Sequence, residues 1–422
     1  MNIVMMTNTF TPHVGGVARS IEQFTAQYRA WGHRVLVVAP EFDNMPDNEV
    51  DVIRIPAFRH FNHTDFSVIK PIPHALQNAI DNFEPDIIHT HHPFLVGSIA
   101  LRLAHSCGVP LVFTHHTKYE DYTHNLPVDT EQVKHFAMNL ATNYANTCEQ
   151  IFAPSESIKE IIASRGVETP ITVVPTGVNT DLFSQADKTR VRRELGLSDS
   201  SFIVGHLGRI SKEKNIEFMT DSVIQFLCSD SAPEDSGFMI CGEGPVLEFV
   251  EEKFAHAGIK HKLHTLGIIA KEQVPDAFAA MDVFAFTSQS ETQGMVITEA
   301  MATSTPVVAL DAPGVRDVVV HGKNGLLLKT TKPAEFAAGL QTVSELDSAQ
   351  LAAMKTAALE TAQSLSMENT AHRAITCYEQ CIDQLQLERP DDYPVFSQAL
   401  SLFETEWQLI TNTVKAAADS FA

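Results

Sequence analysis

The sequence predicts an α/β protein built from two domains, each with a doubly wound parallel sheet. The chain has 422 residues, which is too long for one ordinary hydrophobic core. Short apolar runs alternate with longer helical segments, and this alternation occurs twice. Between the two series stands Pro175-Thr176-Gly177-Val178-Asn179, a cluster of turn-forming residues at a strand end. We therefore expect an N-terminal domain over 1–178, a second domain over 179–378 and a helical tail over 379–422.

The first series starts at the N-terminus. Asn2 to Thr7 is an expected strand, Gly15-Gly16 an expected turn, and Val17 to Trp31 an expected helix that Gly32 ends. The other strands of this domain are expected at 35–38, 87–88, 111–113, 151–153 and 171–174. Ligands of such sheets bind beyond the carboxyl ends of the strands, so the loops that follow these strands are where a site is expected.

The second series has expected strands at 202–205, 237–240, 262–265, 282–286 and 306–310. A polar loop follows 282–286, a helix is expected over Val296–Ala302, and Gly294 stands at their junction. Unpaired N–H groups at a helix start favour a phosphate, and glycine lets a ligand approach the backbone closely. Glu291 in the loop and Glu299 on the helix can accept hydrogen bonds from sugar hydroxyls. This arrangement predicts a nucleotide-sugar site.

Glu291 and Glu299 lie within Ser290-Glu291-Thr292-Gln293-Gly294 and Glu299-Ala300-Met301-Ala302, and Thr305-Pro306-Val307-Val308-Ala309 follows. This segment resembles the E-x7-E motif of retaining GT-B glycosyltransferases of the family-4 type. Ser304 stands where family members usually have glycine, but the difference removes no proposed ligand group. The resemblance implies two Rossmann-like domains facing a cleft, and hexose transfer from a nucleoside-diphosphate sugar with no metal or other cofactor. UDP-glucose or a close relative is the donor that the family's habit suggests.

Further segments match the family on the donor side. Arg209 and Lys214 match residues that bind the donor diphosphate, where fixed cations stabilise the charge that builds on the leaving group. Cys241-Gly242-Glu243-Gly244-Pro245 matches its G-x-G-P element near the nucleotide, and Gly15-Gly16 its loop near the donor phosphate. The resemblance assigns donor binding to Gly15, Gly16, Arg209, Lys214, Gly242, Gly244, Glu291, Gly294, Met295, Val296 and Glu299. No carboxylate is assigned as nucleophile, because the family is thought to react on one face, with the leaving phosphate accepting the acceptor's proton.

His116-Thr117 matches the family's x-H-T element, whose histidine is thought to orient the donor sugar and carry developing charge. The resemblance thus assigns catalytic roles to His116, Glu291, Arg209 and Lys214. The continuation Lys118-Tyr119-Glu120-Asp121-Tyr122 resembles bacterial diacylglycerol glucosyltransferases, and it implies a lipid acceptor contacted by Tyr119 and Tyr122. Two alternatives stay open: transfer to a soluble polyol, sugar or glycan, and a non-enzymatic scaffold that binds sugar nucleotides.

His89-Thr90-His91-His92 has the composition of a metal cluster. Neighbouring side chains diverge on a strand or turn and no carboxylate motif accompanies them, so no metal site is expected. The six cysteines lack CxxC spacing and are expected to be buried, reduced thiols.

Composition limits the partners. A formal charge of −22 argues against nucleic acid and against electrostatic adsorption to anionic lipid. No apolar run is long enough to span a bilayer and no leader is evident, so a cytoplasmic protein is expected, with peripheral contact at the inner face of the plasma membrane left open. One apolar helical stripe is expected in the tail, at Phe396, Leu400, Phe403, Trp407, Ile410 and Val414. Its acidic polar face favours packing or dimerisation over membrane contact, so a monomer and a homodimer are both open.

Overall fold

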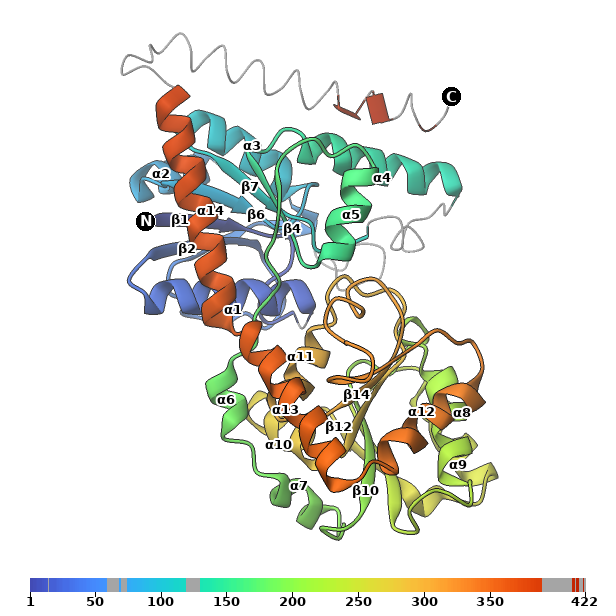
Figure 1. Ribbon diagram of the computed structural model, residues 1–422. Coiled ribbons are helices and arrows are strands. Elements are labelled where there is room, and N and C mark those ends of the chain that lie inside the picture. Colours follow the sequence, from blue (N-terminus) through green and yellow to red (C-terminus); the bar gives the residue numbers. More distant parts are fainter. Residues whose placement is uncertain are drawn as a thin grey trace. The chain divides into compact units, whose positions relative to one another are not determined.

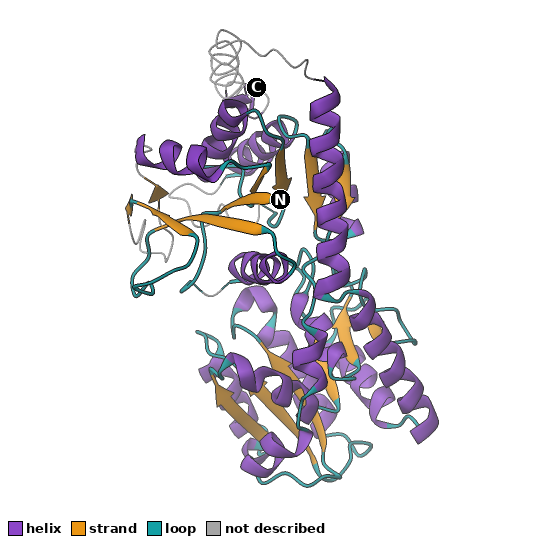
Figure 2. Cartoon of the chain, turned by 90° about the vertical axis from the view of Figure 1, so that its left-hand side faces the viewer, coloured by secondary structure: helices purple, strands orange, loops and turns teal. Residues whose placement is uncertain are grey.

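The computed structural model describes residues 1–13, 15–58, 68–69, 74–118, 130–388, 412–413, 415–416 and 420. They form two compact units (Figure 1). The first consists of Met1–Thr176 with Met367–Ala422, and the second of Gly177–Ser366. Each unit contains a parallel sheet with helices beside it (Figure 2).

The first unit is built around a seven-stranded sheet in the order β3-β2-β1-β6-β7-β8-β9, in which every pairing is parallel. Its strands are β1 (Asn2–Met6), β2 (Arg34–Pro40), β3 (Val52–Ile55), β6 (Ile87–Thr90), β7 (Leu111–Thr114), β8 (Gln150–Ala153) and β9 (Ile171–Val173). A separate antiparallel pair joins β4 (Ala57–Phe58) and β5 (Val68–Ile69). Its helices are α1 (Gly16–Ala30), α2 (His74–Phe83), α3 (Val96–Cys107), α4 (Glu131–Ala145), α5 (Glu156–Ser164) and α14 (Met367–Glu388).

The second unit has a six-stranded parallel sheet in the order β12-β11-β10-β13-β14-β15. Its strands are β10 (Phe202–Leu207), β11 (Ser236–Cys241), β12 (Leu263–Gly267), β13 (Val283–Phe286), β14 (Val307–Leu310) and β15 (Gly325–Leu328). Its α-helices are α6 (Thr180–Ser184), α7 (Lys188–Glu194), α8 (Ile216–Leu227), α9 (Leu247–His256), α10 (Val274–Ala280), α11 (Met295–Ala302), α12 (Pro333–Ser344) and α13 (Ser348–Ser364). Short 3-10 helices are η3 (Lys212–Lys214), η4 (Lys260–Lys262) and η5 (Lys271–Gln273).

Both sheets are covered on both faces. Val4 belongs to a core cluster that includes side chains of α2, α3 and α5, whereas its neighbour Ile3 belongs to a cluster with α1 and α14. In the second unit, the neighbouring residues Ile203 and Val204 likewise belong to two different core clusters. Strands buried on both faces have almost continuous apolar sequences, which is why the apolar runs predicted them.

The strand orders place a topological switch point in each unit, between β1 and β6 in the first and between β10 and β13 in the second. At such a point the connections leave the sheet in opposite directions, which opens a crevice at the carboxyl ends of the two strands. The prediction of two Rossmann-like units is confirmed. Strands β3 and β15, each at one edge of its sheet, were not predicted.

The boundaries between the two units differ from the domain boundaries predicted after residues 178 and 378. The first unit ends at Thr176, and α14 belongs to it although it follows the second unit in the sequence. The reason is the packing of α14 on α1: Tyr378 lies 3.4 Å from the hydroxyl of Tyr28, and His372 stacks on Trp31 with a centroid distance of 4.2 Å. The apolar pattern of α14 predicts a helix but does not identify its partner.

The tail stripe from Phe396 to Val414 lies outside the described residues. Nearby described residues contact α4: Asn412 hydrogen bonds with Asn143, and the hydroxyl of Ser420 accepts from Asn139 at 3.1 Å. No helix among the described residues combines the length and the apolar character needed to cross a membrane.

All six cysteines are free thiols, but the expectation that they are buried is wrong for two of them. Cys228 is exposed at the end of α8, and Cys107 is half-buried at the end of α3. Both stand in the last turn or cap of a helix, where solvent reaches one side of the chain.

Candidate active site

The switch point of the second unit brings two predicted loops together. One follows β10 and contains Lys214, and the other follows β13 and contains Glu291. The Thr287 hydroxyl donates to the carbonyls of Lys214 at 3.0 Å and Asn215 at 3.1 Å, and the Asn215 amide donates to the Thr287 carbonyl at 3.3 Å. Asn215 adopts a left-handed conformation, with φ of 56°, between η3 and α8. These bonds fix the two loops to each other.

Lys214 and Glu291 form an ion pair. The Lys214 ammonium lies 2.6 Å from a Glu291 carboxylate oxygen, and the two side chains are 28% and 17% exposed. Both groups are therefore partly shielded from solvent yet accessible to a ligand. Arg209, on the same loop as Lys214, is exposed.

Gly242 and Gly244 follow β11 and lie against the start of the Lys214 loop. A Cβ atom at Gly242 would clash with the Gly208 carbonyl oxygen, and one at Gly244 with that of Ile210. The backbone N–H of Ile210 donates to the carbonyl of Glu243 at 2.9 Å. The two glycines therefore permit a close backbone contact that supports the loop carrying Arg209.

Gly294 lies at the predicted junction between loop and helix. It has φ of 74°, a left-handed conformation that favours glycine, and α11 begins at Met295 and continues through Val296. The N-cap residue Gly294 has no side chain to cap this end of α11, and the first N–H groups of a helix have no partner within it. Glu299 lies further along α11 and is 2% exposed. The geometry thus confirms the predicted helix start and places Glu299 deeper than Glu291.

Two residues of this unit were missed by sequence reasoning. Gly314 has φ of 79°, and a Cβ there would lie 2.6 Å from the backbone carbon of Thr292, so it supports the Glu291 loop. The sequence feature that could have identified Gly314 is the Pro313-Gly314 dipeptide, which is typical of turns. His206, on β10, is buried; its Nδ1 lies 3.2 Å from the Ala285 carbonyl, and burial lowers its pKa to about 4. The sequence feature that could have identified His206 is the presence of a polar residue within the apolar sequence of a strand.

The switch point of the first unit gathers histidines. His91 and His92 follow β6, and the Nδ1 atom of His91 lies 2.9 Å from Nε2 of His116, which follows β7. The Nδ1 atom of His92 accepts from the backbone N–H of Asn8, after β1, at 3.2 Å. His116 is half-buried. Sequence reasoning identified His116 but not its partner His91.

His89 is linked to α14. Its Nδ1 lies 2.5 Å from the Tyr378 hydroxyl and its Nε2 lies 2.7 Å from the Thr114 hydroxyl. The ring of Tyr378 stacks on Phe152. A buried polar chain therefore runs from α14 to the end of β7, two residues before His116.

Burial keeps these histidines neutral at pH 7, since desolvation disfavours the charged form. It lowers the pKa of His89 and of His92 to about 3. The pKa values of His91 and His116 also lie well below the usual range, first because of burial and then because of neighbouring histidines. Among the described residues no group of three or more His, Cys, Asp or Glu side chains could hold a metal ion.

The other predicted residues of the first unit are Gly15, Gly16, Tyr119 and Tyr122. Gly15 is the extended N-cap of α1 and Gly16 its first residue, so the predicted turn is a helix start. No described atom lies within 4 Å of a Cβ built at Gly16, which leaves space beside the backbone there. Tyr119 and Tyr122 lie outside the described residues.

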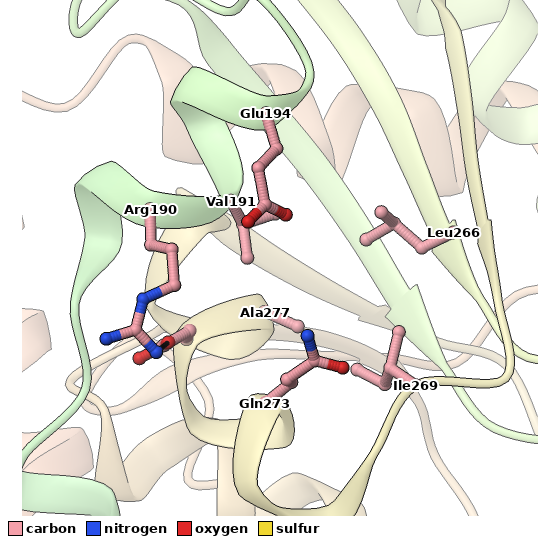
Figure 3. Close-up of a pocket in the computed structure, with 8 residues that line it drawn as sticks. Arg190, Val191, Glu194, Leu266, Ile269, Gln273 and Ala277 are labelled. Carbon is pink, nitrogen blue, oxygen red and sulfur yellow. Dashed lines mark hydrogen bonds and ion pairs between the residues drawn. The ribbon is translucent and has the colours of Figure 1, made fainter.

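The second unit also has a pocket, whose lining residues are drawn in Figure 3. It is lined by residues of α7 and α10 and of the segment around β12, such as Val191, Ala277 and Leu266. At its edge Arg190 is neutralised by Asp276, 2.6 Å away. None of the predicted donor-binding residues lines it, so it carries no part of the candidate site.

Two family models match the chain: Glycosyltransferase Family 4 over residues 14–182 and Glycosyl transferases group 1 over residues 187–361. An alpha-monoglucosyldiacylglycerol synthase of Streptococcus pneumoniae is 28% identical over 334 residues, which cover 78% of this chain and 75% of that protein. A GDP-mannose-dependent alpha-mannosyltransferase of Mycobacterium tuberculosis is 26% identical, covering 78% and 84%. The names of these relatives indicate different sugars, glucose in the first and mannose in the second.

Solved structures share the fold. Anabaena HepE, in complex with UDP and glucose, superimposes with a TM-score of 0.69 at 22% identity, covering 90% of this chain and 99% of that one. Sucrose-phosphate synthase of Thermosynechococcus elongatus gives a TM-score of 0.71 at 20% identity, with 90% and 99% covered.

Proposed function

The chain belongs to the group 1 glycosyltransferases of the family-4 type and is a hexosyltransferase, and from this premise we propose that it transfers glucose from UDP-glucose to diacylglycerol with retention of configuration. The observation that carries the proposal is the Lys214–Glu291 pair at the switch point of the second unit. A fixed cation and a fixed carboxylate, side by side, match the two parts of a nucleotide sugar: a diphosphate and a hydroxylated ring.

The roles follow from charge. Lys214 has three N–H donors, so it can hold Glu291 and a phosphate oxygen at the same time. Exposed Arg209 and the open N-terminus of α11, at Gly294, Met295 and Val296, supply the other phosphate contacts. Glu291 binds the sugar hydroxyls, and we assign Glu299 to the ribose.

The reaction balances without a nucleophilic carboxylate. The bond between the sugar C1 and the diphosphate oxygen breaks, a bond from C1 to the acceptor oxygen forms, and the acceptor's proton passes to the leaving phosphate. Charge on that phosphate is stabilised by Lys214 and Arg209, so we propose that no metal is needed.

Diacylglycerol is proposed because alpha-monoglucosyldiacylglycerol synthases of two bacteria are among the relatives, at 28% and 27% identity. This acceptor places the enzyme in peripheral contact with the inner face of the membrane. A soluble acceptor and a GDP-mannose donor form the second candidate, which the mannosyltransferase relatives and the charge of −22 favour.

The test measures release of nucleoside diphosphate from UDP-glucose, UDP-galactose, UDP-glucuronate and GDP-mannose. Each donor is offered with diacylglycerol in mixed micelles or with soluble polyols, in the presence of EDTA. We expect release from UDP-glucose that depends on diacylglycerol and yields a glycolipid. Release only with a soluble acceptor or only from GDP-mannose would support the second candidate, and loss of activity in EDTA would overturn the metal-free mechanism.

A further inference from the structure

The histidine-rich segment 89–92, at the end of β6, has no role in the function proposed above. His89, His91 and His92 are all buried, and each has a different partner. His89 bonds to Tyr378 and Thr114, and His92 accepts from the backbone of Asn8. His91 forms a nitrogen-to-nitrogen contact with a predicted catalytic residue, His116.

The contact between His91 and His116 joins two ring nitrogens. Nδ1 of His91 and Nε2 of His116 are 2.9 Å apart, and the rings stack with a centroid distance of 5.1 Å. Two neutral imidazoles have one ring proton each, so one nitrogen of the contact must donate and the other must accept. The tautomer of His91 therefore determines that of His116.

The surroundings of His91 favour one of the two arrangements. If His116 donated, the proton of His91 would be on its Nε2, a buried atom with no hydrogen-bond partner among the described residues. Orphaned buried N–H groups are rarer than under-used acceptors in folded proteins. If His91 donates through Nδ1, its Nε2 carries only a lone pair, and no N–H group is left unpaired.

We propose that His91 is a positioning residue that donates from Nδ1 to Nε2 of His116, and so holds neutral His116 with its own proton on Nδ1. His116 then presents an N–H donor, and its ring is fixed in orientation. This role rests on the proposed function, because it matters for catalysis only if His116 acts on the donor sugar. An N–H donor suits an oxygen of the sugar, whereas the other tautomer would present only a lone pair from Nδ1.

The bond between His89 and Thr114 supports the same geometry. Thr114 ends β7 and stands two residues before His116, and the backbone N–H of His116 donates to the Thr114 carbonyl at 3.1 Å. The rings of His89 and His91 lie 4.2 Å apart. His91 is therefore held between His89 and His116 and has little freedom to turn away.

The first test is spectroscopic and needs no substrate. In protein labelled with ¹⁵N-histidine, the long-range proton–nitrogen spectrum distinguishes a protonated Nδ1 from a protonated Nε2. We expect His116 to be protonated on Nδ1, and His91→Phe, which keeps a planar ring without the donor, to produce a mixture of tautomers. A His116 protonated on Nε2 in the wild-type protein would overturn the proposal, whatever the acceptor is.

The second test is kinetic. His91→Phe should lower kcat on the order of 10- to 100-fold, as loss of an orienting hydrogen bond does elsewhere, and leave the KM for UDP-glucose unchanged. His91→Asn places an amide N–H near the position of Nδ1–H and should recover part of kcat. His256→Phe, at an exposed position of α9, is the control and should match the wild type. Wild-type kcat in a folded His91→Phe variant would contradict the positioning role. An equal loss of kcat in His91→Phe and in the control His256→Phe would also contradict it.

Activity is measured as UDP release with and without acceptor, so slow hydrolysis of UDP-glucose still reports kcat if diacylglycerol is not the acceptor. If His91→Phe does not fold, the wild-type spectrum and His91→Asn decide the question. Failure of the proposed function, with no UDP released under any condition, is thus distinct from failure of the His91 assignment.

Discussion

The two units place chemically opposite groups at equivalent positions of the same fold. At its switch point the second unit has an ion pair, Lys214 with Glu291, beside an uncapped helix start. The first unit has buried histidines there, joined to each other, to backbone and to hydroxyl groups. Under the proposed function, Lys214 and Glu291 of the second unit supply charged contacts for a diphosphate and for sugar hydroxyls, whereas the histidines of the first unit can supply only neutral ring N–H groups and lone pairs. The difference teaches that the strand order fixes where a site forms, and the loop residues fix what it binds.

The largest expected effect comes from removing the charge in the second unit. Lys214→Ala should lower kcat about 10²- to 10³-fold, because the developing charge on the leaving diphosphate loses a preorganised donor. Steady-state UDP release measures the change. Lys212→Ala is the matched control: Lys212 is two positions away and its side chain is 82% exposed, so near wild-type activity is expected. Equal losses in both variants would show that general positive charge, and not the Lys214 geometry, is what matters.

The next largest expected effect is a difference between the two units in how their stability depends on pH. His89 and His92 have pKa values of about 3 in the folded protein, compared with the ordinary value of 6.5 for histidine. Below pH 6.5 the unfolded chain binds protons that the folded chain does not, so stability is full above 6.5 and decreases as the pH falls towards 3. The loss is roughly 1 kcal/mol per pH unit for each such histidine.

Hydrogen exchange at pH 7.5 and pH 5.5 would measure this effect. Peptides from β6 and β7 should lose protection at the lower pH more than peptides from β10 and β13, where His206 is the buried histidine with a strongly lowered pKa, about 4. Equal loss in both sheets would contradict the contrast between the units.

A smaller effect, on stability, is expected from removing the contact between α14 and His89. Tyr378→Phe removes the hydroxyl that lies 2.5 Å from Nδ1 of His89 and leaves the rest of the ring in place. The free energy of unfolding should fall by about 1–2 kcal/mol, since a buried nitrogen loses its partner. Urea unfolding gives the value.

Tyr28→Phe is the comparison for this variant. The Tyr28 hydroxyl lies a longer 3.4 Å from Tyr378, so a smaller loss of stability is expected. A loss for Tyr28→Phe as large as for Tyr378→Phe would mean that the bond to His89 is not what stabilises α14.

Sequence patterns predicted the two sheets because strands buried on both faces are apolar throughout, and they predicted the start of α11 because Gly294 follows a polar loop. They also identified Lys214 and Glu291, which lie 77 positions apart and form an ion pair in the structure. They did not predict that α14 returns to the first unit, since an apolar helical face does not specify its partner. The role of His91 was missed because it depends on contact with His116. That contact results from the pairing of β6 with β7, which the local sequence does not reveal.

Binding of UDP, measured by calorimetry alongside turnover, tests the division of labour between the units most directly. We predict that Lys214→Ala weakens UDP binding and lowers kcat, whereas His116→Ala lowers kcat and leaves UDP affinity at the wild-type value. Weaker UDP binding in a folded His116→Ala variant, or wild-type UDP binding in Lys214→Ala, would contradict the assignment of the diphosphate to Lys214 and of a role in turnover alone to His116.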